Sequence, residues 1–157
     1  MPYKAAKVME KGFTDKLIEE NAKNLERTGD YWRRAKEIKR ALPRLAEAAS
    51  LSDDGEVGIR LAYLYMDNYQ YMEAAQTIQK SLKKGDVKRP DEARLLLAQA
   101  LFHAQEYAPA RKIFNQLITA TAKDDKRQKI HKLANQWLSY MELEIKRLKE
   151  IKLYLNA

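Results

Sequence analysis

Few residues in this chain could carry out chemistry. Among 157 residues there are two histidines, His103 and His131, and no cysteine. Neither histidine has a carboxylate at the helical spacing that would complete a recognised metal motif. Without cysteine the chain forms no disulfide of its own and offers no thiolate nucleophile. We therefore expect no catalytic residue, no metal site and no cofactor, and we expect capping or surface roles for both histidines.

Two pairs of adjacent aspartates are the remaining acid–base candidates. Asp53 and Asp54 precede one expected helix, and Asp124 and Asp125 precede another. An aspartate just before a helix commonly accepts hydrogen bonds from the free backbone N–H groups of the first turn. Capping is therefore a better interpretation than acid–base catalysis, and no glycine-rich phosphate loop is present. The sequence predicts a protein that is not an enzyme.

The charge pattern argues against a nucleic-acid partner. The net charge is +8, with eleven basic and seven acidic residues in 1–40, ten of each in 41–122, and nine against five in 123–157. Nucleic-acid binders more often show one concentrated basic stripe with aromatic residues interleaved. No stretch approaches the roughly 18 to 20 consecutive apolar residues of a membrane span. We expect a protein partner and no transmembrane segment in this chain.

The strongest pattern is the similarity of the chain to itself at a step of 36 residues. The matching pairs are Leu61 and Leu97, Ala62 and Ala98, Tyr71 and Tyr107, Ala74 and Ala110, Ile78 and Phe114, and Leu82 and Ile118. Repeats of this length usually form stacked helical units, none of which can bury its apolar face alone. Strong helix formers dominate the composition. The sequence predicts an all-α fold, a right-handed α-solenoid.

The apolar periods divide the expected single domain into five parts. We expect a half repeat at 1–12, a degenerate repeat at 22–54, repeats at 55–90 and 91–124, and a long C-terminal helix at 125–157 whose first half caps the solenoid. Because the first part is only half a repeat, we expect the chain to be a fragment of a longer protein.

Two residues mark expected irregularities of these helices. Pro43 lies inside a predicted helix, which should therefore start late or kink. Gly85 should end a helix in a left-handed conformation. Four aromatic residues lie at core spacings and should pack inside, namely Trp32, Tyr65, Trp137 and Tyr140.

Small and large apolar residues alternate in these repeats in a recognisable way. Ala62 and Ala74 in one unit, and Ala98 and Ala110 in the next, are flanked by large residues such as Tyr65. This pattern resembles the tetratricopeptide repeat (TPR), a pair of antiparallel helices. The resemblance implies about three TPR-like hairpins and a role in holding a partner protein.

In TPR proteins the first helix of each unit lines a concave face, so the resemblance also implies a binding groove. Apolar residues beside charges suit a bound peptide or helix. The alternative is that neighbouring units or the C-terminal helix bury the apolar ones. Some TPR proteins bind the C-terminal carboxylate of a peptide with basic residues on these faces. This chain has Glu26 and Asp30 at such positions, so we do not expect it to bind a terminal carboxylate in that way. The expected groove residues are Arg33, Arg34, Ile59, Tyr63, Met66, Asp67, Leu95, Gln99, Phe102 and His103.

Four segments carry a closer resemblance. They are 3–12, 51–56, 88–93 and 136–140. Together they resemble the C-terminal part of the TPR proteins that accompany TonB, ExbB and ExbD energy-transducing systems of Gram-negative bacteria. The resemblance implies a periplasmic, non-enzymatic accessory of TonB-dependent uptake.

Other functions stay open at this point. The main alternative is a cytoplasmic TPR adaptor or regulator that binds a peptide segment of a partner, with an RNA-binding helical module a distant third. In addition, Leu148, Ile151 and Leu155 continue an apolar stripe beyond the last repeat. This stripe predicts intermolecular contacts, with a homo-oligomer as one form.

Overall fold

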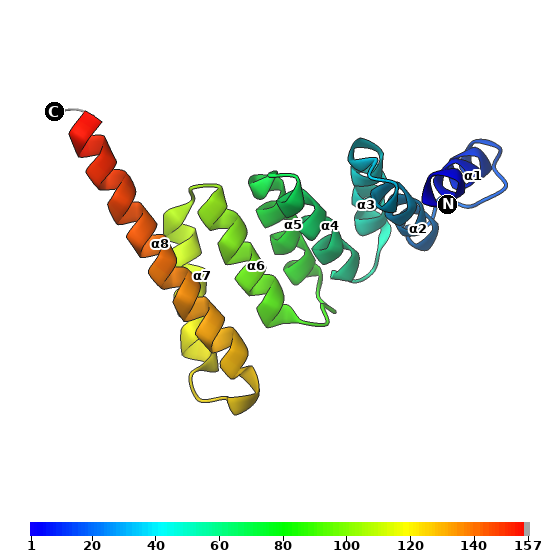
Figure 1. Cartoon of the computed structure of the whole chain (residues 1–157). Helices are drawn as coiled ribbons and strands as arrows, with labels where there is room; N and C mark the ends of the chain where they lie inside the picture. The colour runs from blue at the N-terminus through cyan, green and yellow to red at the C-terminus, as the bar shows by residue number, and fades with distance from the viewer. Residues whose placement is uncertain (156–157) are drawn as a thin grey trace. The chain divides into compact units, whose positions relative to one another are not determined.

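The structure is a computed structural model that describes residues 1–155, and it is helical throughout (Figure 1). No strand occurs among these residues, which confirms the predicted all-α class. The helices are α1 (Pro2–Thr14), α2 (Ala22–Arg34), α3 (Ile38–Leu51), α4 (Glu56–Asp67), α5 (Tyr71–Lys84), α6 (Pro90–His103), α7 (Tyr107–Thr121), the 3-10 turn η1 (Asp125–Arg127) and α8 (Gln128–Leu155).

The helices form two compact units, residues 1–88 and 89–157, of which residues 156 and 157 lie outside the described part. In the first unit α1 packs against α2, α2 against α3, α3 against α4, and α4 against α5. In the second, α6 packs on α7, α7 on α8, and α8 also returns to α6. None of the described helices is long and apolar enough to span a bilayer.

The core of the first unit follows the apolar period of its helices. Trp32 and Leu45 join one cluster that runs from α1 to α4, and Phe13 and Leu25 join a second cluster beside it. Ala41, Ala62 and Ala74 are fully buried, because side chains of this size let neighbouring helices approach closely. The buried members of the two clusters are Ala6, Trp32, Ala41, Leu45, Leu61 and Leu64, and Phe13, Leu25, Ala48 and Val57.

Glu10 and Arg44 attach α1 to the rest of this unit. The Glu10 carboxylate accepts hydrogen bonds from the Trp32 indole Nε1 at 2.9 Å and from Arg44 Nε at 3.0 Å and Nη2 at 2.5 Å. Burial raises the pKa of Glu10, but the bonds from Arg44 and Trp32 and the charge of Arg44 outweigh burial and lower it from its ordinary value. This pair therefore holds α1 to both α2 and α3.

Two expectations for this unit are corrected in detail. The helix with Pro43 does not start late, since α3 begins at Ile38 and Pro43 lies inside it with an exposed ring. Proline has no N–H to donate to the carbonyl of Lys39 one turn earlier, and Lys39 is an exposed residue. Gly85 does end α5 with a positive φ of 92°, but its ψ of −171° is extended rather than left-handed helical. Such a conformation is accessible mainly to glycine.

The second unit is built around α6, which is buried on most sides. Leu97 and Leu101 lie in its core with Phe114 and Leu117 of α7. In α8 the buried side chains are Ala134 and Met141. A helix that is apolar around most of its circumference needs neighbours on two sides, which α7 and α8 supply.

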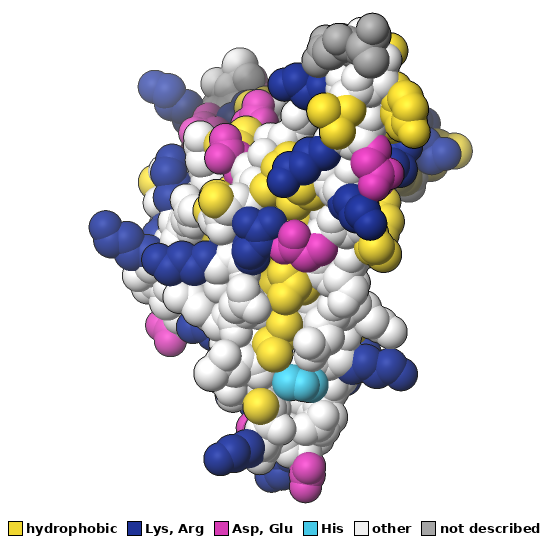
Figure 2. All heavy atoms as spheres, turned by 90° about the vertical axis from the view of Figure 1, so that its left-hand side faces the viewer, with side chains coloured by type: hydrophobic (Ala, Val, Ile, Leu, Met, Phe, Trp, Pro, Cys, Tyr) yellow, Lys and Arg dark blue, Asp and Glu magenta, His cyan; other side chains and the backbone are white. Residues whose placement is uncertain are grey.

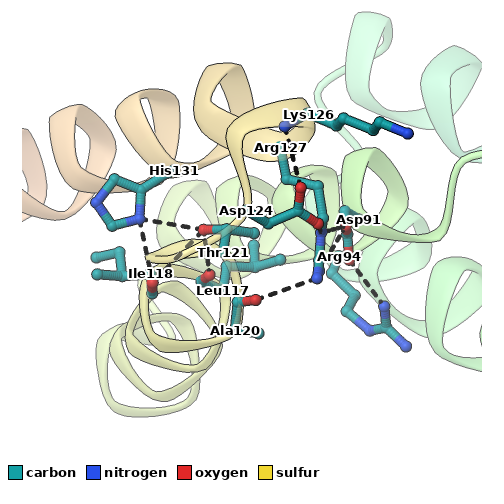
Figure 3. Close-up of polar contacts among 10 residues, drawn as sticks. All are labelled: Asp91, Arg94, Leu117, Ile118, Ala120, Thr121, Asp124, Lys126, Arg127 and His131. Carbon is teal, nitrogen blue, oxygen red and sulfur yellow. Dashed lines mark hydrogen bonds and ion pairs between the residues drawn. The ribbon is translucent and has the colours of Figure 1, made fainter.

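Polar contacts fix the turn that connects α7 to α8 (Figure 3). The Arg127 guanidinium binds the Asp91 carboxylate of α6 at 2.7 Å and the Ala120 carbonyl of α7 at 3.1 Å. The His131 Nδ1 lies 3.2 Å from Thr121 Oγ1 and 3.1 Å from the Ile118 carbonyl. The turn η1 is thereby tied to both α6 and α7, and the start of α8 to α7.

Candidate functional site

A concavity in the first unit lies where the sequence predicts the groove. It has a volume of about 250 Å³ and opens between α2 and α4, with α3 beneath it. Its lining alternates charged and apolar side chains. The lining residues are Glu26, Asp30, Arg33, Leu45, Arg60, Tyr63, Leu64 and Asp67.

The charged residues of this concavity are largely paired with one another. Arg60 of α4 forms an ion pair with Glu26 of α2, and Arg33 pairs with Asp30 at 3.1 Å one turn earlier in the same helix. These pairs are half-exposed, so solvent screens them and a ligand can replace either partner at small cost. The lining has three carboxylates, the third being Asp67, against two guanidinium groups. It therefore favours a segment with a basic or neutral residue over an acidic one.

The apolar part of the concavity offers one accessible ring. Tyr63 is 47% exposed, whereas Leu45 and Leu64 are buried and form the floor. A tyrosine ring with an apolar body and a polar tip is a common anchor for bound peptides because few rotamers are lost on binding. The arrangement suits an extended or helical peptide.

Three predicted groove residues, Arg33, Tyr63 and Asp67, lie together here. Arg34 is exposed but does not line the concavity. Ile59 is buried and Met66 is half-buried, so both contribute to packing more than to the surface. The part of the predicted site that falls in the first unit is therefore narrower than the sequence suggests.

The four remaining predicted residues lie on α6 in the second unit. Leu95 is buried and Gln99 is half-buried, while His103 is exposed at the helix end. Phe102 is 6% exposed because its ring lies 5.7 Å from Tyr140 and 6.2 Å from Trp137, both on α8. The C-terminal helix thus covers Phe102, as in the alternative raised from the sequence.

His103 belongs to the same aromatic cluster. Its ring lies 5.1 Å from Phe102 and 6.0 Å from Trp137, and although the residue is exposed at the surface, partial desolvation of the imidazole lowers its pKa. Trp137 is half-buried, but Tyr140, expected in the core, is exposed. The Tyr140 ring meets the rings of Phe102 and Trp137 edge to face, at 80° and 83°, and these contacts leave 52% of the residue exposed.

The sequence did not single out Arg60, Leu45 or Leu64 for the site. Arg60 follows Ile59 on the first helix of its repeat, three residues before Tyr63, so helical spacing puts both on one face. That spacing could have identified Arg60. The leucines come from positions that repeat as core residues, and nothing in their pattern marks them as the floor of a concavity.

A second cavity in the first unit, of about 310 Å³, lies among α3, α4 and α5. Its most polar member, the Lys84 ammonium, donates to the carbonyls of Ala49 at 3.0 Å and Ser52 at 2.5 Å at the end of α3. A cation at a helix C-terminus satisfies free carbonyls and opposes the negative end of the dipole. Lys84 thus caps α3 at one side of the cavity, whose lining also includes Lys80 and Tyr65.

One aspartate of each pair bonds to the backbone near a helix start: Asp124 is the N-cap of η1, whereas Asp54 lies one residue before Gly55, the N-cap of α4. Asp54 accepts a hydrogen bond from the Glu56 backbone N–H at 2.9 Å, and Asp124 accepts one from the Lys126 N–H at 3.0 Å. Among residues 1–155, no group of three or more histidine, aspartate or glutamate side chains is placed to hold a metal ion.

Comparison with known proteins identifies the fold. No family model matches the chain, and no curated protein matches it. Among solved structures, the chain is similar to a crystal structure from Podosopora anserina described as a putative kinesin light chain with nearly identical TPR-like repeats. The two chains are 14% identical, and the match covers 99% of this chain and 84% of that one with a TM-score of 0.71. This similarity shows the fold alone and confirms the predicted α-solenoid of TPR-like repeats.

Proposed function

We propose that the chain is a non-enzymatic scaffold that binds a peptide segment of a partner protein in the concavity between α2 and α4. One observation carries the proposal: α2 and α4, which are both first helices of predicted repeats, bring Arg33, Tyr63 and Asp67 to one concave surface. The ring of Tyr63 stacks on an apolar side chain of the peptide, and Asp67 and the two ion pairs contact its polar groups.

We further propose that the partner belongs to a TonB-dependent energy-transduction system of the cell envelope, which places the chain in the periplasm. The support for this step is the resemblance of four segments of the sequence to the TPR proteins that accompany TonB, ExbB and ExbD. Within those segments Gly55 faces the Ser81 carbonyl so closely that any larger residue would overlap it. The segments thus include packing positions as well as surface positions.

Titration of the chain with the periplasmic domains of TonB and ExbD tests both steps. Tyr63→Ala is expected to weaken binding by roughly 1 kcal/mol or more, because an aromatic anchor is lost. Met72→Ala removes another exposed apolar side chain of the same unit and is the matched control. Arg33→Ala and Arg34→Ala form a second pair, in which only Arg33 lines the concavity.

The outcomes separate the two steps of the proposal. In one outcome the chain binds neither domain and instead binds a cytosolic protein, with Tyr63→Ala weakening that binding. This result would support the concavity as the binding site and would replace the envelope partner by the alternative of a cytoplasmic adaptor. Binding that Tyr63→Ala and Arg33→Ala leave unchanged would remove the concavity as the site. Loss of binding in both control variants would point to a general loss of structure, which circular dichroism detects.

A further inference from the structure

The concavity between α2 and α4 has a charge opposite to the net charge of the chain. Figure 2 shows lysine and arginine side chains spread over one side of the molecule, in keeping with the net charge of +8. The lining of the concavity instead has three carboxylates and two guanidinium groups. Its formal charge is therefore −1, which favours a cationic group of a ligand.

The excess negative charge belongs to Asp67. Glu26 is paired with Arg60 and Asp30 with Arg33, so each guanidinium of the lining already has a carboxylate. Among residues 1–155, no basic side chain forms an ion pair with Asp67, and its carboxylate accepts no hydrogen bond. A cation brought by a ligand can therefore bind Asp67 without breaking an ion pair of the chain.

Asp67 is also the last residue of α4, where an acidic side chain is unfavourable. The C-terminal end of a helix is the negative end of its dipole, which cations stabilise and carboxylates destabilise. The first helices of the other two repeats, α2 and α6, end in the basic residues Arg34 and His103. α4 has no basic residue in its last turn. In the free chain Asp67 thus adds a negative charge to a helix end that lacks a cation.

Elsewhere in the chain, a helix end without a basic residue of its own receives a cation from another element. Lys84 serves α3, where its ammonium donates to the carbonyls of Ala49 and Ser52. Arg127 serves α7, whose Ala120 carbonyl it binds at 3.1 Å (Figure 3). No lysine or arginine side chain among residues 1–155 donates to a carbonyl in the last turn of α4.

We propose that a peptide bound in the concavity supplies this cation as an arginine side chain, which pairs with Asp67 at the end of α4. The proposal rests on the proposed function and names the residue type that the concavity selects in its partner. Arg127 shows the same pattern within the chain, because its guanidinium binds the Asp91 carboxylate at 2.7 Å together with a carbonyl at a helix end. A guanidinium has five N–H donors in a fork that matches a carboxylate, whereas the ammonium of lysine is a point charge.

Tyr63 offers the same arginine an apolar contact. It precedes Asp67 by four residues, so both lie on one face of α4, and both line the concavity. Tyr63 is 47% exposed. The methylene stem of an arginine can pack on such a ring while its guanidinium reaches the carboxylate one turn further along the helix.

The test uses single amino acids with an N-acetyl and an N-methylamide group as probes of this one contact. Blocked arginine, citrulline, lysine and glutamate are titrated into the full chain labelled with nitrogen-15, and the amide shifts of Tyr63 and Asp67 are followed. Citrulline has nearly the shape of arginine but no charge. We expect blocked arginine to bind at least about fivefold more tightly than citrulline or lysine, and glutamate to bind most weakly.

One variant and its control locate the cation. Asp67→Asn should weaken binding of blocked arginine about fivefold and bring it close to that of citrulline. Asp53→Asn should leave binding unchanged, since Asp53 is another exposed aspartate of the same unit but does not line the concavity.

Thermal unfolding gives a second readout of the role of Asp67. Asp67→Asn should unfold at a higher temperature than the parent, because a carboxylate is removed from the negative end of a helix dipole. The variant would thus be more stable and bind less tightly. A lower unfolding temperature would show that Asp67 has a structural role and would overturn the proposal.

Three binding results would also overturn it. They are equal binding of arginine and citrulline, equal binding of arginine and lysine, and equal effects of Asp67→Asn and Asp53→Asn. If Tyr63→Ala still weakened binding of the TonB or ExbD domain in such a case, the concavity would stand as the peptide site and only the arginine contact would be wrong. If blocked arginine bound as expected but neither domain did, the contact would stand and the envelope partner would be wrong.

Discussion

At the scale of single residues, the packing of the helices depends on small side chains at a few positions. Ala74 of α5 and Ala110 of α7 occupy equivalent positions 36 residues apart, and both are fully buried. Gly55 is held against the Ser81 carbonyl, where a Cβ would come within 2.2 Å of the oxygen. Gly55 therefore has no room for even one additional carbon, and the two alanines leave no surface exposed to solvent.

Replacing Ala110 with leucine should therefore destabilise the protein by about 1 to 3 kcal/mol, because a packed core has to shift to admit three further carbons. Ala120→Leu is the control, since Ala120 lies on the same helix with an exposed side chain. Urea denaturation of both variants makes the comparison. Equal midpoints for Ala110→Leu and the parent would contradict the packing described for α7.

Two glycines one turn apart should respond differently to alanine. At Gly55 the added carbon meets a backbone carbonyl, whereas at Gly58 the nearest atom is the Ser81 hydroxyl, which is the end of a side chain. Because a backbone moves less readily than a hydroxyl, Gly55→Ala should lower the free energy of unfolding by about 1 to 3 kcal/mol, and Gly58→Ala by less. The reverse order in thermal melts would show that the α4–α5 contact is arranged differently.

At the scale of elements, polar contacts between helices attach α1 and α8 to their units. α1 contributes Ala6 and Phe13 to the core, and the Glu10 bonds to Trp32 and Arg44 complete its attachment. α8 is attached at one end by His131 and Arg127 and in its middle by the Arg111–Glu142 pair. Such contacts make element stability sensitive to pH and salt.

The stability provided by Glu10 should depend on pH in a defined direction. Its pKa is lowered in the folded protein, so its contribution is fully present above the ordinary value of 4.5 and is lost as the pH falls below 4.5 through the lowered value. Glu10→Gln should thus cost about 1 to 2 kcal/mol at neutral pH, an amount reduced by the partial exposure of the pair, and should cost less near pH 3.

Urea denaturation of the parent and Glu10→Gln at both pH values measures this difference. Glu47→Gln is a suitable control, because Glu47 binds the same Arg44 at 3.1 Å from a more exposed position and should matter less. A cost for Glu10→Gln that stays constant between pH 7 and pH 3 would show that the charge of Glu10 does not attach α1.

At the scale of the whole molecule, the sequence predicted the helical class and the hairpins well. The 36-residue repeat and the helix end predicted at Gly85 are signals that lie within one or two repeats of the sequence. The binding surface was less predictable. Helical spacing assigns Phe102 to a concave face, but only the packing of α8 shows that Trp137 and Tyr140 cover it. The apolar period of one helix shows which face is buried, but it does not show which distant segment of the chain covers that face.

The division into two compact units predicts that one unit can unfold locally while the other stays folded. Leu117→Ala leaves a cavity among α6, α7 and α8 and should cost about 2 to 5 kcal/mol there. Amide hydrogen exchange should then rise across α6 to α8 and remain slow in α2 and α3. A uniform rise along all helices would indicate a single cooperative unit instead.

The contact between His131 and Thr121 fixes which nitrogen of the imidazole carries the hydrogen. The Thr121 hydroxyl has one hydrogen and donates it to the Leu117 carbonyl at 2.6 Å, so it can only accept from the histidine. Since the Ile118 carbonyl beside it is also an acceptor, the hydrogen must be on Nδ1, and in the neutral ring Nε2 is left with a lone pair. Nitrogen-15 chemical shifts of the ring would therefore show the Nδ1–H tautomer, the minor form of free neutral histidine. They would give a spectroscopic marker for the start of α8 that disappears when this turn opens.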